Sequence, residues 1–198
     1  MKKFGWILFL FAFISVAQAQ EEDNQEIRTI VDGKITSIGA FGGPKMSFTT
    51  FDHDYAFEMG GGGGIILNHK LFFGGYGMGL TTDVNPSVNE FANYTIDFEH
   101  GGFWFGYIVN HYKPIHPSIS LQAGWGNIVV QDEFFVDVRT DNVFVFNPIA
   151  ELEINMTKFF KMGVGANFRM VLDENFVEYE SLDFSSPGVF VSFKFGAF

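Results

Sequence analysis

The most regular hydrophobic pattern in the chain runs from Lys161 to Leu172. Every second residue there is apolar, and those between include lysine, arginine, asparagine and two glycines. A period of two predicts a β-strand whose two faces meet different surroundings. The apolar face continues for about the ten residues that a tilted strand needs to cross a bilayer. We interpret this strand as part of the wall of a small membrane barrel, with its polar face directed inward.

The same alternation recurs between turn residues and predicts eight strands in all. The predicted strands cover residues 35–51, 56–67, 71–82, 94–109, 118–130, 143–156, 161–172 and 188–198. The predicted fold class is therefore all-β, an eight-stranded antiparallel up-and-down transmembrane β-barrel.

The predicted connections alternate in length along the chain. Residues 68–70, 110–117 and 157–158 form short turns, each with one lysine. The other loops, three of them long, hold thirteen acidic residues and one base; they cover residues 52–55, 83–93, 131–142 and 173–187. Short turns at one end and longer loops at the other are typical of outer-membrane barrels. An even strand number then places both termini at the short-turn end, on the periplasmic side.

The N-terminus has the features of an export signal. Lys2 and Lys3 precede an apolar run at residues 6–16 and a small-x-small cleavage site at Ala17-Gln18-Ala19. We predict a signal peptide over residues 1–19, a polar periplasmic leader over residues 20–34 and the barrel over residues 35–198.

Composition narrows the class further. The chain has no cysteine, so an exported domain of this size needs another source of stability, which a closed barrel supplies. It has 27 phenylalanines, more than a soluble surface would normally expose but suited to a lipid-facing wall. The net charge of −11 excludes a nucleic-acid binder that relies on phosphate contacts.

With the signal, the eight strands and the terminal Phe198 in place, the chain resembles the small outer-membrane β-barrel proteins of Gram-negative bacteria. The OmpA transmembrane domain and OmpX are the best-known shapes of this size, and the chain looks most like uncharacterised members of the class. The resemblance also rests on Gly42-Gly43-Pro44, on the run Gly60–Gly64 and on residues 101–107.

This resemblance implies that outer-membrane lipid and lipopolysaccharide surround the barrel. It also implies that the barrel-insertion machinery reads the C-terminal strand ending in Phe198. Such barrels usually carry apolar residues at every second position before the terminal phenylalanine. Here those positions hold Gly196, Lys194, Ser192 and Phe190, so the apolar set lies one residue out of phase.

Charged residues on the predicted inner faces are the main site candidates. They are Glu58, Asp97, Glu99, Glu151, Glu153, Lys161, Arg169 and Lys194. They could form a proton or ion path, or an ion-paired core. An eight-stranded barrel is just wide enough for its own side chains, and buried charges must be paired. We therefore expect a structural ion-pair cluster.

Three other motifs are weaker candidates for a functional site. His116 and Ser118 have the His-x-Ser spacing that some barrel lipid deacylases use, but they lie at the short-turn end without an obvious acid. His100 is predicted on an outer face. The loop residues Asp52-His53-Asp54 offer at most a weak cation site or a cation bridge to lipopolysaccharide phosphate. No catalytic residue, cofactor site or metal site is predicted.

The pattern favours a non-enzymatic outer-membrane protein with a structural or surface-interaction role. Loops 131–142 and 173–187 keep strand propensity and are expected to meet an extracellular protein partner. One alternative is a narrow channel for small solutes, whose lumen Phe103, Phe105, Tyr107 and the inward charges must not fill. The others are a lipid-acting barrel enzyme and a secreted soluble barrel whose inward apolar face binds an apolar ligand.

Overall fold

The computed structural model describes residues 34–51, 54–82, 84, 95–131, 137–172 and 184–198. The predicted signal peptide and nearly all of the predicted leader lie outside these residues. The described strands are β1 (Ile38–Phe51), β2 (Asp54–Leu67), β3 (Leu71–Leu80), β4 (Thr95–Ile108), β5 (Ile115–Gln131), β6 (Asp137–Asn155), β7 (Phe160–Leu172) and β8 (Ser186–Ala197). No helix in the described part of the chain is long and apolar enough to cross a membrane.

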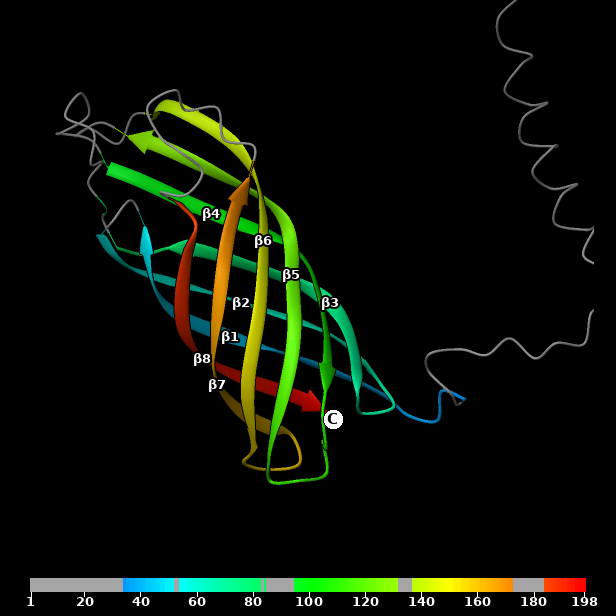
Figure 1. The fold of residues 1–198 in the computed structure, drawn as a ribbon. Helices are drawn as coiled ribbons and strands as arrows, with labels where there is room; N and C mark the ends of the chain where they lie inside the picture. Colours follow the sequence, from blue (N-terminus) through cyan, green and yellow to red (C-terminus); the bar gives the residue numbers. More distant parts are fainter. Residues whose placement is uncertain (1–33, 52–53, 83, 85–94, 132–136, 173–183) are drawn as a thin grey trace, which may run out of the picture. The chain divides into compact units, whose positions relative to one another are not determined.

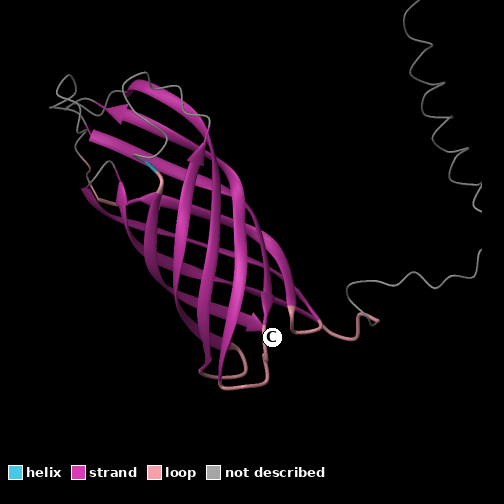
Figure 2. Ribbon diagram, viewed as in Figure 1, coloured by secondary structure: helices cyan, strands magenta, loops and turns pink. Residues whose placement is uncertain are grey.

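The eight strands form one closed antiparallel barrel, as the alternating pattern predicts. Each strand pairs with the next along the chain, and β1 closes the barrel by pairing with β8 (Figures 1 and 2). The C-terminus lies at the same end as the connections β2–β3, β4–β5 and β6–β7 (Figure 1). We refer to this end as the short-turn end and to the other as the loop end.

The β2–β3 turn shows why the short turns are short. Its two central residues, Asn68 and His69, both have positive φ angles, of 52° and 58°. Two such residues make a type I′ hairpin, whose twist matches that of the flanking strands. The Asn68 side chain also accepts a hydrogen bond of 2.8 Å from the backbone N–H of Thr36. This turn therefore fixes the rim and holds His69 at the short-turn end.

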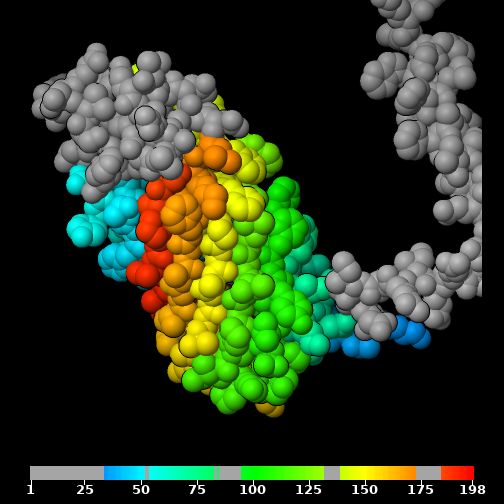
Figure 3. All heavy atoms as spheres, viewed as in Figure 1, coloured from blue at the N-terminus to red at the C-terminus, as the bar shows by residue number. Residues whose placement is uncertain are grey.

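The outer wall is apolar, and the charged residues of β7 and β8 face inward. Large exposed apolar side chains include Phe48, Ile65, Phe73, Phe105, Trp125, Leu152, Phe168 and Phe195. Figure 3 shows one face of this wall, over β5 to β8. Lys161, Arg169 and Lys194 are buried, so the soluble-barrel alternative, which requires these charges outside, is wrong.

A row of polar side chains marks where the apolar wall ends toward the loops. Glu99, Asn127 and Asn142 lie side by side in register on β4, β5 and β6, and all point outward. On β4 the apolar outward positions run from Tyr107 back to Gly101 before Glu99 is reached. That span approaches the nine to eleven residues of a membrane-crossing strand.

The side chains of strand β4 face the opposite sides of the barrel wall from those predicted. Phe103, Phe105 and Tyr107 are on the outer wall, whereas His100 and Trp104 are buried inside. Both faces of this strand carry bulky apolar groups, so alternation alone could not decide the sense. The glycine run of β2 gives the physical reason, because a Cβ at Gly62 would lie only 3.0 Å from the Trp104 ring. The inward glycine leaves the space that the indole occupies.

Two apolar clusters fill much of the barrel interior. One closes the loop end and comprises Phe51, Ala56, Val84, Ile96, Phe98, Ile128, Val130, Val143, Val145, Val171 and Phe184. The other lines the β1–β4 side and comprises Phe41, Ile66, Phe72, Tyr76, Met78, Trp104 and Ile108, with Phe198 packed against it. The terminal phenylalanine therefore faces the interior, and Ala197 is the last outward residue of β8.

Candidate functional site

The candidate site is a polar network inside the barrel, built mainly by β6, β7 and β8. Glu151 and Glu153 point inward two residues apart on β6. The Nζ atom of Lys194 lies between them, 2.6 Å from Glu151 Oε2 and 2.7 Å from Glu153 Oε1. Lys161 approaches Glu153 from β7 at 3.4 Å. Period-two alternation on adjacent strands thus brings opposite charges to one level of the barrel.

A glycine on β7 makes room for this network. Gly163 pairs with Glu153 in register and faces the interior. A Cβ at this position would fall 1.8 Å from Glu151 Oε1 and 2.5 Å from Ser192 Oγ. The Glu151 carboxylate, which Ser192 and Lys194 both contact, therefore occupies the volume that any side chain would take.

His116 and Ser118 of β5 complete this network and do not form a nucleophilic pair. His116 Nε2 lies 3.2 Å from Glu153 Oε2, and its Nδ1 lies 2.9 Å from the Lys113 carbonyl oxygen. Ser118 donates instead to Glu151, at 3.4 Å. Because both imidazole nitrogens are engaged, neither can accept the Ser118 proton, as a Ser–His mechanism requires. The acid that sequence inspection did not find is Glu153, and it holds the ring in a buried network.

A second ion pair lies nearer the loop end. The Arg169 guanidinium of β7 contacts the Glu58 carboxylate of β2 across the barrel. The same guanidinium donates to the backbone carbonyls of Thr50, at 3.0 Å, and Phe184, at 3.2 Å. Its carbon also lies 5.1 Å from the centre of the Phe51 ring, within cation–π range. Arg169 therefore links β1, β2 and the residue Phe184 before β8 through one buried charge.

An amide row occupies the level between the two charged groups. Asn147 of β6 donates to Gln122 of β5 at 3.0 Å and accepts from Asn167 of β7 at 2.8 Å. All three side chains are buried. Their hydrogen bonds run along the barrel wall, which satisfies most of the polar groups that a dry interior would otherwise leave unpaired.

Lys45 is a buried cation that the sequence-based prediction omitted. It faces inward from β1, and its Nζ lies 4.2 Å from the centre of the Phe190 ring. Among the described residues no carboxylate oxygen lies within 4.0 Å of it. The sequence signal for an inward Lys45 was the alternation of β1, in which Lys45 falls on the face opposite to that of Met46.

Six of the eight predicted lumen charges are inside the barrel, and two are not. Glu58, Glu151, Glu153, Lys161, Arg169 and Lys194 are buried. Asp97 and Glu99 lie exposed on the outer wall near the loop end, so their predicted inward position is wrong. They share a face with Phe103 and Phe105, which were assigned inward by the same inverted sense of β4. His100, predicted outside, is buried with its Nδ1 3.2 Å from the Tyr76 hydroxyl.

The remaining sequence motifs lie in β2 and in the predicted loop before it. Asp52 and His53 lie outside the described residues, and Asp54 begins β2. The run Gly60–Gly64 lies wholly within β2. Within the residues that the structure describes, no group of three or more histidine, aspartate or glutamate side chains is placed to hold a metal ion.

The closed eight-stranded barrel, with its apolar outer wall and its buried charged network, has the fold of the small outer-membrane barrel proteins. Among solved structures it is similar to Neisserial surface protein A, NspA, with a TM-score of 0.62 and 11% identity, over 80% of this chain and 96% of that chain.

Two structures of Ail, the attachment invasion locus protein of Yersinia pestis, also match, each with a TM-score of 0.49 over 80% of this chain and 97% of Ail. Their identities are 13% and 12%, and the first is a complex with the heparin analogue sucrose octasulfate. No protein-family model and no curated protein matches the sequence.

Proposed function

We propose that this protein is a non-enzymatic outer-membrane barrel that anchors surface-interaction loops and conducts no solute. The observation that carries the proposal is the filling of its interior. The charged network occupies the short-turn half, the amide row lies above it, and the apolar cluster around Phe51 and Phe184 closes the loop end. A barrel filled at three levels acts as a scaffold.

The orientation follows from the two unlike ends. The short turns face the periplasm, and the loop end faces outward, as is usual for outer-membrane barrels. Asp97 and Glu99 then lie on the outer wall at the level of the lipopolysaccharide headgroups. Divalent cations can bridge such carboxylates to the phosphates of lipopolysaccharide.

The loop end offers a surface to an extracellular protein. β5 and β6 stay paired as far as Gln131 and Asp137, well beyond the polar row at Asn127 and Asn142. This extended hairpin includes residues 137–142 of the loop predicted at 131–142. Residues 132–136 and 173–183 are outside the described part of the chain, and loops 131–142 and 173–187 together remain the proposed partner surface.

The C-terminal strand is the proposed contact of the barrel-insertion machinery. Its outward apolar residues are Val189, Val191, Phe193 and Phe195, and Phe198 faces inward. We infer that the machinery reads this outward set, one residue out of phase with the usual terminal phenylalanine.

The channel alternative is tested by electrical recording. Purified protein inserted in planar bilayers is expected to show no sustained conductance, because the described interior is packed with paired charges and apolar side chains. A gel-mobility shift between boiled and unboiled samples checks that the inserted protein is folded. Stable open-pore currents from folded protein would reject the closed-scaffold proposal and favour a narrow channel.

A further inference from the structure

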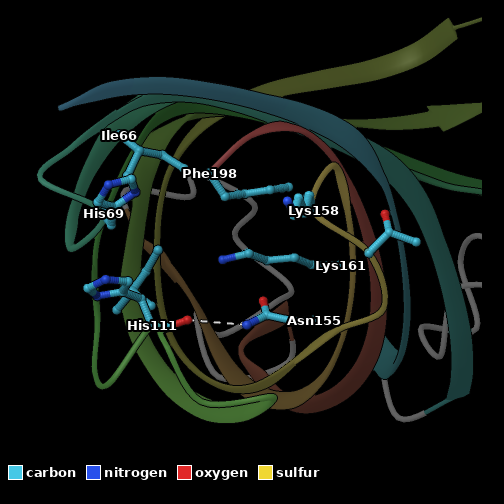
Figure 4. Close-up of a pocket in the computed structure, with 9 residues that line it drawn as sticks. Ile66, His69, His111, Asn155, Lys158, Lys161 and Phe198 are labelled. Atoms are coloured by element: carbon cyan, nitrogen blue, oxygen red, sulfur yellow. Dashed lines mark hydrogen bonds between the residues drawn. The ribbon is translucent and has the colours of Figure 1, made fainter.

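A pocket of about 500 Å³ opens into the barrel at the short-turn end. It lies at the opposite end from the apolar cluster around Phe51. Lys158 and Lys161 line it together with His69 and His111 (Figure 4). The pocket therefore gathers basic side chains in a chain whose net charge is −11.

Each basic group is placed there by a local feature of the sequence. The type I′ turn carries His69, whose ring stacks on that of His111 with 5.1 Å between centroids. The Thr157 hydroxyl accepts from the backbone N–H of Phe160 at 3.0 Å and closes the β6–β7 turn that carries Lys158. Figure 4 shows Lys161 reaching across the pocket from β7.

The charge of Lys161 is only partly compensated. Among the described residues its single carboxylate contact is Glu153, at 3.4 Å, and Glu153 is held more closely by Lys194, at 2.7 Å. The Lys161 ammonium also lies 4.3 Å from the centre of the Phe198 ring. The Lys161 ammonium therefore keeps donor capacity for an anion in the pocket, where it also disfavours a bound cation.

Two polar atoms in the pocket wall have no hydrogen-bond partner among the described residues. They are His111 Nδ1 and Asn155 Oδ1, and both are shielded from solvent. The orientation of the Asn155 amide is fixed because its Nδ2 donates to the carbonyls of His111, at 3.2 Å, and Lys113, at 2.9 Å. Asn155 Oδ1 is therefore an acceptor that needs a donor. A shielded polar atom without a protein partner is rare, and at a pocket wall it can accept a hydrogen bond from water or from a bound group.

We propose that this pocket binds a phosphate monoester group. Carboxylates and sulfonates offer only acceptor atoms, which suits the two lysines and leaves Asn155 Oδ1 unsatisfied. A phosphate monoester has a second pKa of about 6, so at pH 6 about half of it is the monoanion, which presents both charged oxygens and a P–O–H donor. Its oxygens accept from Lys158 and Lys161 while its hydroxyl donates to Asn155. Ile66, Ile108 and Phe198 supply an apolar wall for the organic part of the ester.

The pH dependence of binding follows from the groups that face His111. Partial desolvation lowers the pKa of His111 below its ordinary value, with further lowering by His69, Lys161, Lys70 and His116. In the free protein the ring is therefore neutral near pH 7. A bound anion reverses this balance, so binding should raise the pKa of His111 and should strengthen as the pH falls toward 6.

The test is calorimetric titration, at pH 6, of the mature full-length chain in detergent micelles with phenyl phosphate and, for comparison, benzenesulfonate. The sulfonate has the same ring and a tetrahedral anion without a donor, so it should bind at least about tenfold more weakly. Lys158→Gln should weaken phenyl phosphate binding by about tenfold, the loss of one charge-assisted hydrogen bond. Lys113→Gln, which removes a turn lysine outside the pocket, is the matched control and should change little.

Two further measurements identify the source of the phosphate and exclude misfolding of a variant as the reason for lost binding. If phosphatidic acid in lipid nanodiscs competes with phenyl phosphate, the natural ligand is a lipid headgroup; without competition, it is a soluble ester. An NMR titration of the unsubstituted protein should show the His111 pKa rising on addition of phenyl phosphate. Equal binding of sulfonate and phosphate, equal effects of the two lysine changes, or an unmoved His111 pKa would overturn the proposal.

Discussion

Glu153→Gln is expected to lower the free energy of unfolding by about 3–5 kcal/mol, the usual cost of removing one partner from a buried ion pair. Glu153 contacts Lys194, Lys161 and His116, so within the described part of the chain its loss leaves Lys161 with no carboxylate contact and Lys194 with Glu151 alone. The measurement is denaturant-induced unfolding in lipid vesicles, followed by the gel-mobility shift of the folded barrel.

Glu99→Gln is the matched control for this change. It removes the same charge from the same residue type, but Glu99 is exposed on the outer wall of β4. Its effect should stay within about 0.5 kcal/mol, as for most surface substitutions. If the two substitutions destabilise the barrel equally, the assignment of Glu153 to the inside and Glu99 to the outside is wrong.

Phe168→Arg is expected to impair insertion and to lower stability by about 2–4 kcal/mol, the cost of a guanidinium on the lipid face near the bilayer midplane. Phe168 lies outward on β7, where it is 42% exposed. Refolding yield into lipid vesicles measures the effect. Phe168→Leu keeps an apolar side chain there and should be mild, so equal tolerance of arginine and leucine would contradict a membrane-facing wall.

The sequence predicted the strand number, the barrel closure and the sense of the strands that have one polar face. Strand β7 was clear because Lys161, Asn167 and Arg169 alternate with apolar residues, and a charge cannot face lipid cheaply. Strand β4 could not be assigned in the same way. Its two faces carry Phe103 and Phe105 on one side and Phe98 and Trp104 on the other, so the period of two has two equivalent solutions.

The pairing inside the barrel depends on register, which the sequence did not specify. Glu151 and Glu153 meet Lys194 because β7 pairs Gly163 with Glu153 and Ser192, which leaves a gap between the two charged strands. The position of His116 beside Glu153 likewise follows from their direct pairing between β5 and β6. Such cross-strand neighbours are 37 or more residues apart in sequence, beyond the reach of any local pattern.

The most direct test of the transmembrane, loop-outward barrel is cysteine labelling of intact cells. The native chain has no cysteine, so Thr140→Cys and Lys113→Cys each give an unambiguous signal. Both positions are exposed, Thr140 toward the loop end of β6 and Lys113 in a short turn. A membrane-impermeant reagent should label the Thr140 variant on intact cells and the Lys113 variant only after the outer membrane is permeabilised. Labelling of the Lys113 variant but not of the Thr140 variant on intact cells would show that the barrel is inverted. Equal labelling of both variants in protein recovered from the medium would contradict a membrane barrel altogether.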